Sequence, residues 1–505
     1  MATPPVLRPI RVPATSLADL AARLGLAPPA NSADVTGAAQ ASPDVQPGDL
    51  YIALPGARTH GAAYAAEAAA RGAHAILTDS AGADRVADSS AACLPLLVTV
   101  DPRALAGPAA ALIFGDPSRR LRIAGITGTN GKTTTAHLVD AVLRGLGKAT
   151  ALLGTIHTRI GTEQLPAVRT TPEAAQLQAL LATAVERGIE YASMEVSSHA
   201  LALQRVDGVR FAVGAFTNLS VDHLDFHADL DDYFAAKARL FDGRAEREVV
   251  TVDDEAGRAL VTPDSVTVSI AEDSSAMWRA TDIRRAGHGQ RFRLHAPDGT
   301  GHDASIGLPG RFNVANGLLA VAIAVTLGAP LPDVVKQLAV APGVPGRMEH
   351  VGGASAPILA VVDYAHAPDG VTQALAALRE TTPGRLICVL GCGGDRDTTK
   401  RPAMGAAAAA GADLFIATDD NPRSEVPAMI RAAMLSGARS VPGAGEVIEV
   451  GDRAAAINRA VELARPTDTV AVLGKGHEQG QEIAGEMTPF DDRRVLADAV
   501  ARVFG

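Results

Sequence analysis

Cysteine is scarce in this chain, and its few cysteines are poorly placed for a shared role. The 505 residues include three cysteines, Cys93, Cys388 and Cys392, which lie mostly far apart. The one close pair has no second pair and no histidine nearby at zinc-site spacing, which excludes a zinc module. Reduced thiols fit a cytoplasmic protein best, and we expect that location.

Aromatic residues, basic clusters and long apolar runs are also lacking. Aromatics make up 3% of the chain and the formal net charge is -10, whereas a nucleic-acid surface needs clustered Lys and Arg with stacking rings. No run of 18 or more apolar residues could cross a membrane. Nucleic-acid and membrane partners are therefore excluded. The chain is 47% hydrophobic and 20% charged, typical of a soluble globular protein of about three domains, which we expect to be a monomer.

Helix and strand patterns alternate along the chain, which predicts an α/β fold with three domains. The first, at 1–118, alternates short strands with helices. The second, at 119–345, begins with an apolar strand that runs into a glycine-rich turn and a helix, which is typical of a parallel nucleotide-binding sheet. The third, at 346–505, reads as a doubly wound α/β domain. Strands are expected at 49–54, 74–78, 94–100, 121–126, 191–196, 210–216, 358–363, 385–390, 413–418 and 469–473.

The sharpest functional signal is the turn after the strand at 121–126, Gly125-Ile-Thr-Gly128-Thr129-Asn130-Gly131-Lys132-Thr133-Thr134. Glycines in such a turn let backbone N–H groups close around phosphate oxygens. Lys132 is expected to reach the β- and γ-phosphates, and Thr133 to offer its hydroxyl to Mg²⁺. Ile126 stands where the standard motif has its first glycine, so this is a variant. A nucleotide site alone leaves ATPase, kinase and ligase possible.

Two further clusters follow strands of the same predicted sheet. Residues 194–201 bring Glu195, and residues 217–225 bring His223, each to the carboxyl end of a strand. Open α/β sheets bind their ligands at that edge. Charge there interrupts strongly apolar runs, which disfavours a mere surface role. Glu195 and His223 are therefore candidate ligands of a second Mg²⁺.

Together these motifs resemble the Mur ligase family, in the same order and over almost the whole chain. Besides the phosphate loop and residues 195–201 and 217–225, the resemblance rests on Leu308-Pro-Gly-Arg311-Phe-Asn313-Val-Ala-Asn316, Gly346-Arg347-Met-Glu349, Asp363-Tyr364-Ala-His366 and Gly391-Cys-Gly-Gly-Asp395-Arg396-Asp397. It implies an N-terminal domain for a UDP-sugar, a central P-loop ATPase, and a C-terminal Rossmann-like domain for the incoming amino acid. It also implies ATP as a co-substrate, together with Mg²⁺.

The resemblance assigns roles at the nucleotide site. Those implied for ATP are Gly128, Thr129, Asn130, Gly131, Lys132, Thr133, Thr134, Asn218, Asn313, Arg347, Asp363, Tyr364 and His366. Those implied for the metal are Thr133, Glu195, His223 and a carbamylated Lys237, and the implied catalytic set is Lys132, Glu195, His223 and Lys237. Taken alone, Lys237 in the amphipathic helix at 233–241 reads as a solvated helix face. Carbamylation needs a neutral amine, which burial can provide.

One short motif in the third predicted domain indicates which amino acid is added. Asp420-Asn421-Pro422-Arg423 resembles the signature of family members that use meso-diaminopimelate, and the resemblance adds Arg401, Gly474 and Glu478 to the pocket. An arginine fork can hold the distal carboxylate of diaminopimelate bidentately, and Glu478 can receive its distal ammonium. Lysine has no such carboxylate and would leave Arg423 unpaired. Without the family context, Asn-Pro is as typical of an ordinary turn.

On the UDP-sugar side, the resemblance implies binding of a UDP-muramoyl dipeptide by Ser42, Thr170, Thr171, Ser197 and Arg205. The chain departs from the family here, because Ala41-Ser42-Pro43 stands where Asp-Ser-Arg is common. Val221 and Thr399 also stand where arginine and glycine are usual.

These implications combine into one expected reaction, in peptidoglycan precursor synthesis. The γ-phosphoryl group of ATP passes to the D-Glu γ-carboxylate of the dipeptide, and the amine of meso-diaminopimelate attacks the resulting acyl phosphate. A lysine-adding ligase, a folylpolyglutamate-type ligase and a non-enzymatic nucleotide switch are the alternatives. Arg423 disfavours the first, the whole Asp-Asn-Pro-Arg string the second, and the number of separate catalytic motifs the third.

Overall fold

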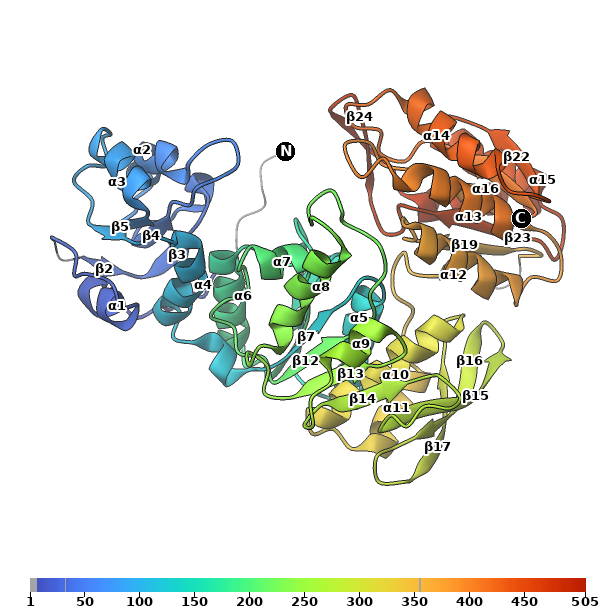
Figure 1. Ribbon diagram of the computed structural model, residues 1–505, viewed down its shortest axis with the longest axis horizontal. Helices are drawn as coiled ribbons and strands as arrows, with labels where there is room; N and C mark the ends of the chain where they lie inside the picture. The colour runs from blue at the N-terminus through green and yellow to red at the C-terminus, as the bar shows by residue number, and fades with distance from the viewer. Residues whose placement is uncertain (1–6, 32, 354–355) are drawn as a thin grey trace.

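A computed structural model describes residues 7–31, 33–353 and 356–505 of the chain. Three α/β bodies follow one another along it, blue, green to yellow, and orange to red in Figure 1, and each is built around its own sheet. The expected three-domain α/β class is confirmed, while the limits at 118 and 345 stay predictions.

The first sheet is small and wholly parallel, in the order β3-β4-β5-β6. Leu50 and Leu77 turn to the face covered by α1 and α4, whereas Tyr51 and Ile76 turn to the opposite face against α2. This alternation is what two buried faces of a parallel sheet require. The elements are β1 (Thr15–Ser16), α1 (Leu17–Arg23), β2 (Asp34–Val35), β3 (Gly37–Ala39), β4 (Asp49–Ile52), α2 (Ala65–Ala70), β5 (Ala75–Thr78), α3 (Ser80–Ala87), β6 (Leu96–Val98) and α4 (Pro102–Ile113).

The second sheet has eleven strands in the order β10-β9-β8-β11-β7-β12-β13-β14-β15-β16-β17. Ile123 on β7 packs toward α6, and Ala124 and Ile126 pack toward α5 and α10. The expected parallel sheet is right for the core, β8 to β15. The core strands are β7 (Arg122–Thr127), β8 (Thr150–Leu153), β11 (Tyr191–Glu195), β12 (Val213–Phe216), β13 (Glu248–Thr251), β14 (Val266–Ser269) and β15 (Trp278–Ala286), and the helices are α5 (Lys132–Gly145), α6 (Ala174–Glu186), α7 (Ser198–Ala202), α8 (Leu230–Ala238), α9 (Glu255–Leu260), α10 (Arg311–Thr326) and α11 (Leu331–Ala339).

Both edges of this sheet are antiparallel, and these edge strands were not among those predicted from the sequence. β9 (His157–Ile160) and β10 (Glu163–Pro166) extend one edge, and β16 (Gly289–His295) and β17 (Gly301–Ile306) extend the other. These strands are joined by short turns instead of helices, and antiparallel pairing is what such turns allow.

The third sheet runs β18-β19-β23-β20-β21-β22, parallel except for β18. On β20, Cys388 faces the helices α12, α13 and α14, whereas Ile387 and Val389 face α15 and α16, so the sheet is doubly wound as expected. The strands are β18 (Glu349–Val351), β19 (Leu359–Asp363), β20 (Leu386–Leu390), β21 (Leu414–Ala417), β22 (Glu446–Glu449) and β23 (Thr469–Leu473), and the helices are α12 (Pro368–Arg379), α13 (Lys400–Gly411), α14 (Pro427–Arg439), α15 (Arg453–Leu463) and α16 (Asp492–Phe504).

A separate hairpin of β24 (Gly480–Ile483) and β25 (Glu486–Pro489) precedes α16. It projects from the third body toward the N-terminal side in Figure 1. Within the described ranges, no helix is both long and apolar enough to cross a membrane.

Candidate active site

The loop at 128–131 joins β7 to α5 and has the backbone form that glycine permits. Gly128 and Gly131 have φ of 141° and 86°, values that other residues rarely adopt. Lys132 turns its Nζ back onto the loop, at 2.9 Å from Gly128 O and 2.8 Å from Thr129 O. Burial lowers the pKa of Lys132 below its ordinary value, although Glu195 and Asp222 act in the opposite direction. The Lys132 side chain is thus held against two carbonyls of the loop.

The motif that begins at Thr217 braces this loop. The side chain of Asn218 accepts from Asn130 N at 3.0 Å and donates to Asn130 O at 3.1 Å, and Thr217 Oγ1 donates to the same oxygen at 2.6 Å. Asn218 and Asn316 also line a small cavity of about 60 Å³ beside the loop. The structure therefore gives Asn218 a part in holding the phosphate loop in shape.

A cavity of about 180 Å³ lies next to the loop and brings together most of the residues predicted for ATP and metal. From those predictions it is lined by Thr129, Asn130, Gly131, Lys132, Thr133, Thr134, Glu195, His223, Lys237, Asn313, Arg347, Asp363, Tyr364 and His366. Thr170 and Ser197, predicted for the sugar substrate, line it as well. We call it the nucleotide cavity.

Thr133 and Glu195 form the centre of the predicted metal site. Thr133 Oγ1 donates to Glu195 Oε2 at 2.7 Å and accepts from Arg347 Nη2 at 3.0 Å. This donor set fits Mg²⁺, which binds one or two carboxylates and completes its shell with phosphate and water oxygens. Among the described residues, no group of three or more His, Cys, Asp or Glu could hold a metal ion by itself. Phosphate oxygens would therefore have to contribute.

Lys237 is buried, so the solvated helix face suggested by its own helix is wrong. Only 1% of the residue is exposed, its Nζ lies 4.1 Å from the centre of the Tyr233 ring, and it donates to Gly128 O at 2.7 Å. Burial holds the pKa of Lys237 well below its usual value, and the nearby Lys132 lowers it further. A large neutral fraction is what carbamylation requires.

Asp222 connects two domains at this site. Its carboxylate lies 3.7 Å from Nε2 of His223 and, across the domain boundary, 3.7 Å from Nε2 of His366 and 3.9 Å from Nζ of Lys400. Burial acts to raise the pKa of Asp222, but these groups outweigh it and hold the pKa at about 2. Burial also lowers the pKa of His223 to about 3, which keeps its imidazole neutral and able to bind a cation.

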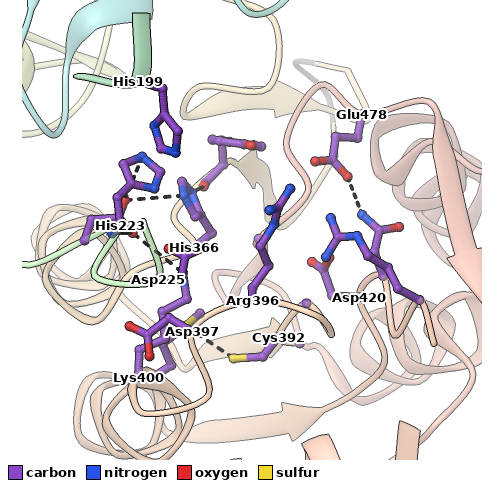
Figure 2. Close-up of a pocket in the computed structure, with 18 residues that line it drawn as sticks. His199, His223, Asp225, His366, Cys392, Arg396, Asp397, Lys400, Asp420 and Glu478 are labelled. Atoms are coloured by element: carbon purple, nitrogen blue, oxygen red, sulfur yellow. Dashed lines mark hydrogen bonds and ion pairs between the residues drawn. The ribbon is translucent and has the colours of Figure 1, made fainter. Parts of the chain in front are cut away.

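A second cavity, of about 340 Å³, opens on the other side of Asp222, and we call it the amino-acid cavity. Figure 2 shows His199 and His223 on one side of it and Arg396, Asp420 and Glu478 on the other. Of the residues predicted for diaminopimelate, it is lined by Asp420, Asn421, Arg423, Gly474 and Glu478.

Two residues predicted for the same pocket lie outside its wall. Arg401 pairs with Glu425, at 2.9 and 2.8 Å, and is 5% exposed. Pro422 faces Gly394, where a side-chain carbon would meet Pro422 O at 1.9 Å. Both residues support the turn that carries Arg423 instead of facing the cavity.

A buried lysine that the sequence predictions did not include supports two residues of this wall. Lys475 is fully buried, and its Nζ donates to Asn421 Oδ1 at 3.0 Å and to Glu478 Oε2 at 2.9 Å. Asn421 Nδ2 also donates to Glu478 Oε2, at 2.8 Å. One oxygen of Glu478 is thus fixed from two sides, which leaves the carboxylate oriented.

The predicted sugar residues divide between two places. Arg205 lines a third cavity of about 420 Å³ between the first and second bodies, together with Arg8, Arg103 and Arg169, and pairs with Glu173 at 3.0 Å. The remaining predicted residues do not line this cavity: Thr170 and Ser197 belong to the nucleotide cavity, Thr171 is buried and donates to Glu195 O at 2.9 Å, and Ser42 is buried and donates to Glu67 at 2.8 Å.

Known proteins share this arrangement. Family models match at residues 35–111 (Mur ligase family, catalytic domain), 126–324 (Mur ligase middle domain) and 346–476 (Mur ligase, glutamate ligase domain). A Streptomyces coelicolor protein named UDP-N-acetylmuramoyl-L-alanyl-D-glutamate--2,6-diaminopimelate ligase is 52% identical over 504 residues, 99% of each chain. The chain belongs to the Mur ligase family.

Solved structures agree. One titled UDP-N-acetylmuramoyl-L-alanyl-D-glutamate--2,6-diaminopimelate ligase has a TM-score of 0.64 and 32% identity, and the match covers 93% of this Mur ligase and 95% of that chain. Mycobacterium tuberculosis folylpolyglutamate synthase, at a TM-score of 0.60 and 20% identity over 80% of this chain and 94% of its own, shows a common fold only. This Mur ligase is an ATP-dependent ligase, as expected.

Sequence reasoning missed several charged residues of the Mur ligase site. Asp222 and Arg396 belong to motifs that the sequence analysis named, but no role was predicted for either residue. Lys400 and Lys475 directly neighbour residues with a predicted role. Their burial or their position on a cavity wall marks them in the structure. For Asp222, Lys400 and Lys475, the sequence signal was a charged residue directly beside a residue with a predicted role, as in Lys400-Arg401.

Proposed function

We propose that this Mur ligase adds meso-2,6-diaminopimelate to the D-Glu γ-carboxylate of UDP-N-acetylmuramoyl-L-alanyl-D-glutamate, in peptidoglycan precursor synthesis. The supporting observation is the wall between two cavities. Asp222 and His223 line both the nucleotide cavity and the amino-acid cavity, and Arg423 and Glu478 line the second. A carboxylate activated in the first cavity can therefore meet an amine held in the second. The Streptomyces coelicolor relative has this reaction in its name.

On the nucleotide side, the chain supplies positive charge to the phosphates. Lys132 exchanges its two loop carbonyls for phosphate oxygens of ATP, and Arg347 reaches the same region from the third body, held over the Tyr364 ring at 4.5 Å. Thr133, Glu195 and His223 would hold Mg²⁺, which, when bound, disperses phosphate charge.

The reaction then consists of two displacements. An oxygen of the γ-carboxylate attacks the γ-phosphorus and ADP leaves, which gives an acyl phosphate. The neutral amine of diaminopimelate attacks the acyl carbon, inorganic phosphate leaves, and the amine loses one proton. The chain positions both partners, and its contribution is orientation and charge stabilisation.

Lys237 is proposed to act as a carbamate. Its buried amine, whose pKa is held well below the usual value, can add CO₂ in its neutral form with loss of a proton, and the new carboxylate would join Glu195 beside the phosphate loop. Intact mass measured in bicarbonate should show the mass of one CO₂ on the native chain and none on Lys237→Arg, because an arginine stays protonated. An unmodified native chain under those conditions would remove this part of the proposal.

At the far end of the amino acid, Arg423 is proposed to hold the distal carboxylate and Glu478 the distal ammonium. The arginine-lined third cavity is proposed to take the UDP moiety, since its guanidinium groups suit a diphosphate. All three cavities are lined by one chain, so we propose that it works as a monomer. Its free cysteines suit the cytoplasm, the proposed location.

The test is release of phosphate from ATP with the UDP-muramoyl dipeptide, compared between meso-diaminopimelate, L-lysine and no amino acid. Release should require diaminopimelate, and analysis of the product should find it linked to the peptide. Equal turnover with lysine would establish the lysine-adding alternative. Binding of ATP with no release under any condition would establish the nucleotide switch.

A further inference from the structure

The backbone of Arg423 is held in an unusual conformation by the hairpin of β24 and β25. Its φ is 53°, in the left-handed region that residues other than glycine seldom occupy. Arg423 N donates to Glu482 O at 3.0 Å and Ala484 N donates to Arg423 O at 2.7 Å, which bridges Arg423 to Ile483 in the parallel sense. The hairpin therefore fixes the backbone position from which the Arg423 side chain extends.

The guanidinium group is already partly occupied. Nη1 donates to Gly394 O at 2.5 Å, and Nε lies 3.6 Å from Glu482 Oε2. In the described part of the chain, Nη2 makes no hydrogen bond. Glu482 thus stands at the edge formed by Nε and Nη2, one of the edges at which an arginine binds a carboxylate bidentately.

Arg423 separates two spaces, and Glu482 faces only one of them. Arg423 lines the amino-acid cavity and also a wider groove of about 940 Å³, which Glu482, Met487 and Val168 line too. Glu482 does not line the amino-acid cavity. A ligand carboxylate in the amino-acid cavity and Glu482 in the groove can therefore both reach the same guanidinium group.

Nearby acids are less suited to this position. Asp395 accepts from Ser424 Oγ at 2.7 Å and from Ser424 N at 3.2 Å, and Glu478 is fixed by Lys475 and Asn421. Among the described residues, the Glu482 carboxylate accepts no side-chain hydrogen bond, and Arg423 is the cation with which it forms an ion pair. Its backbone N–H is anchored to Asn421 Oδ1 at 3.0 Å, while its carboxylate is about one-third exposed and free to turn away.

We propose that Glu482 is a specificity-determining residue, a resident carboxylate that competes with the distal carboxylate of the amino acid for Arg423. This rests on the proposed function. An amino acid with a distal carboxylate displaces Glu482, so part of its binding free energy is offset by the lost pair. An amino acid without one, such as L-lysine, leaves the pair intact and gains nothing from Arg423.

The consequence has a definite sign. Glu482→Gln keeps the shape and the backbone hydrogen bond but removes the competing charge, so the KM for diaminopimelate falls. Half-exposed ion pairs are weak, and the expected fall is about 2- to 5-fold. The kcat stays the same, because Glu482 does not touch the reacting atoms. The KM for lysine stays the same, so the preference for diaminopimelate over lysine rises by a similar factor.

The experiment compares the native chain, Glu482→Gln and Glu486→Gln. Glu486 lies on the same hairpin, on strand β25, and makes no ion pair among the described residues, so it controls for the loss of one negative charge. The KM and kcat for diaminopimelate and for lysine are measured for each, together with the Kd for diaminopimelate by calorimetry. A lower KM and Kd in Glu482→Gln alone supports the proposal.

Two other results would overturn it. A KM that rises in Glu482→Gln would mean that Glu482 positions Arg423 instead of competing for it, and an unchanged KM, or the same fall in Glu486→Gln, would mean that it does neither. In both cases the native chain still uses diaminopimelate, so the proposed function stands. If the native chain neither binds nor uses diaminopimelate, the proposed function and this inference fail together.

Discussion

Arg453 and Asp492 form an ion pair whose loss should damage the amino-acid cavity from a distance. Both side chains are 0% exposed, and two hydrogen bonds of 2.7 Å join them. Arg453 also donates to Leu473 O at 2.9 Å and to Asp419 O at 3.3 Å. These carbonyls directly precede the two segments that carry Gly474 to Glu478 and Asp420 to Arg423. The pair therefore anchors both loops of the cavity.

The perturbation is Asp492→Asn, which keeps the shape of the side chain but leaves the guanidinium charge buried without a counter-ion. Breaking a buried pair in this way costs about 3–5 kcal/mol, and because the amide can still accept one hydrogen bond we expect about 3 kcal/mol. At 1.4 kcal/mol for each factor of ten, that corresponds to an increase of about 100-fold in the exchange rate of the protected amides.

Hydrogen exchange read strand by strand is the suitable assay, because the chain has three domains and one global unfolding curve would mix them. Amides of β20 and β23 should exchange faster in Asp492→Asn, and those of β7 should not. The KM for diaminopimelate should rise while the KM for ATP stays constant. The control, Glu462→Gln, breaks an exposed pair with Arg459 on the same helix and should shift stability by less than about 0.5 kcal/mol. Unchanged protection of β23 in Asp492→Asn would refute the reasoning.

Three more predictions concern other parts of the molecule. Lys237→Ala should abolish phosphate release but retain ATP binding, measured by calorimetry; loss of ATP binding in a folded variant would contradict the assigned role. Burial lowers the pKa of His137 to about 3 from 6.5, so the unfolded chain binds more protons between these values, and stability falls as the pH drops from about 6.5 toward 3. His137→Leu should make this loss shallower by up to about 1.4 kcal/mol per pH unit, measured by the fluorescence of Trp278, which lies in the core of the same body; an unchanged slope would contradict it. Arg205→Ala should raise the KM for the UDP-muramoyl dipeptide by about 10-fold, since charge-assisted hydrogen bonds contribute about 1.5–3 kcal/mol, and leave the KM for ATP unchanged. An equal rise in both KM values would show that Arg205 does not act at the site of the UDP-muramoyl dipeptide alone.

The local parts of the fold and site were predictable from sequence. The phosphate loop is one strand, a run of glycines and a helix start, so the pattern at 121–134 carries nearly all of its geometry. The motif at 217–225 was likewise found, because charge after an apolar strand is unusual. The parallel core and the doubly wound third body follow from the same alternation of strands and helices.

The features that depend on contacts between distant residues were not predictable. Lys237 reads as solvated from its own helix, whereas the phosphate loop, 109 residues away at Gly128, lies against its amine. Arg401 stays a prediction for the pocket, and its pairing with Glu425, 24 residues further along, could not be read from the sequence. The antiparallel edge at β16 and β17 was not predicted, because β16 alternates charged with apolar residues and neither strand is a continuous apolar run.

The position of Asp222 has a consequence for the order of events. Moving the third body away would remove His366 and Lys400 from this carboxylate at once, and its negative charge, balanced by fewer neighbouring groups, would then face the triphosphate. ATP is therefore held more tightly when the bodies are together, and by thermodynamic reciprocity ATP must favour the closed arrangement to the same extent. We therefore expect bound nucleotide to favour, through this one carboxylate, the arrangement in which both bodies line the amino-acid cavity.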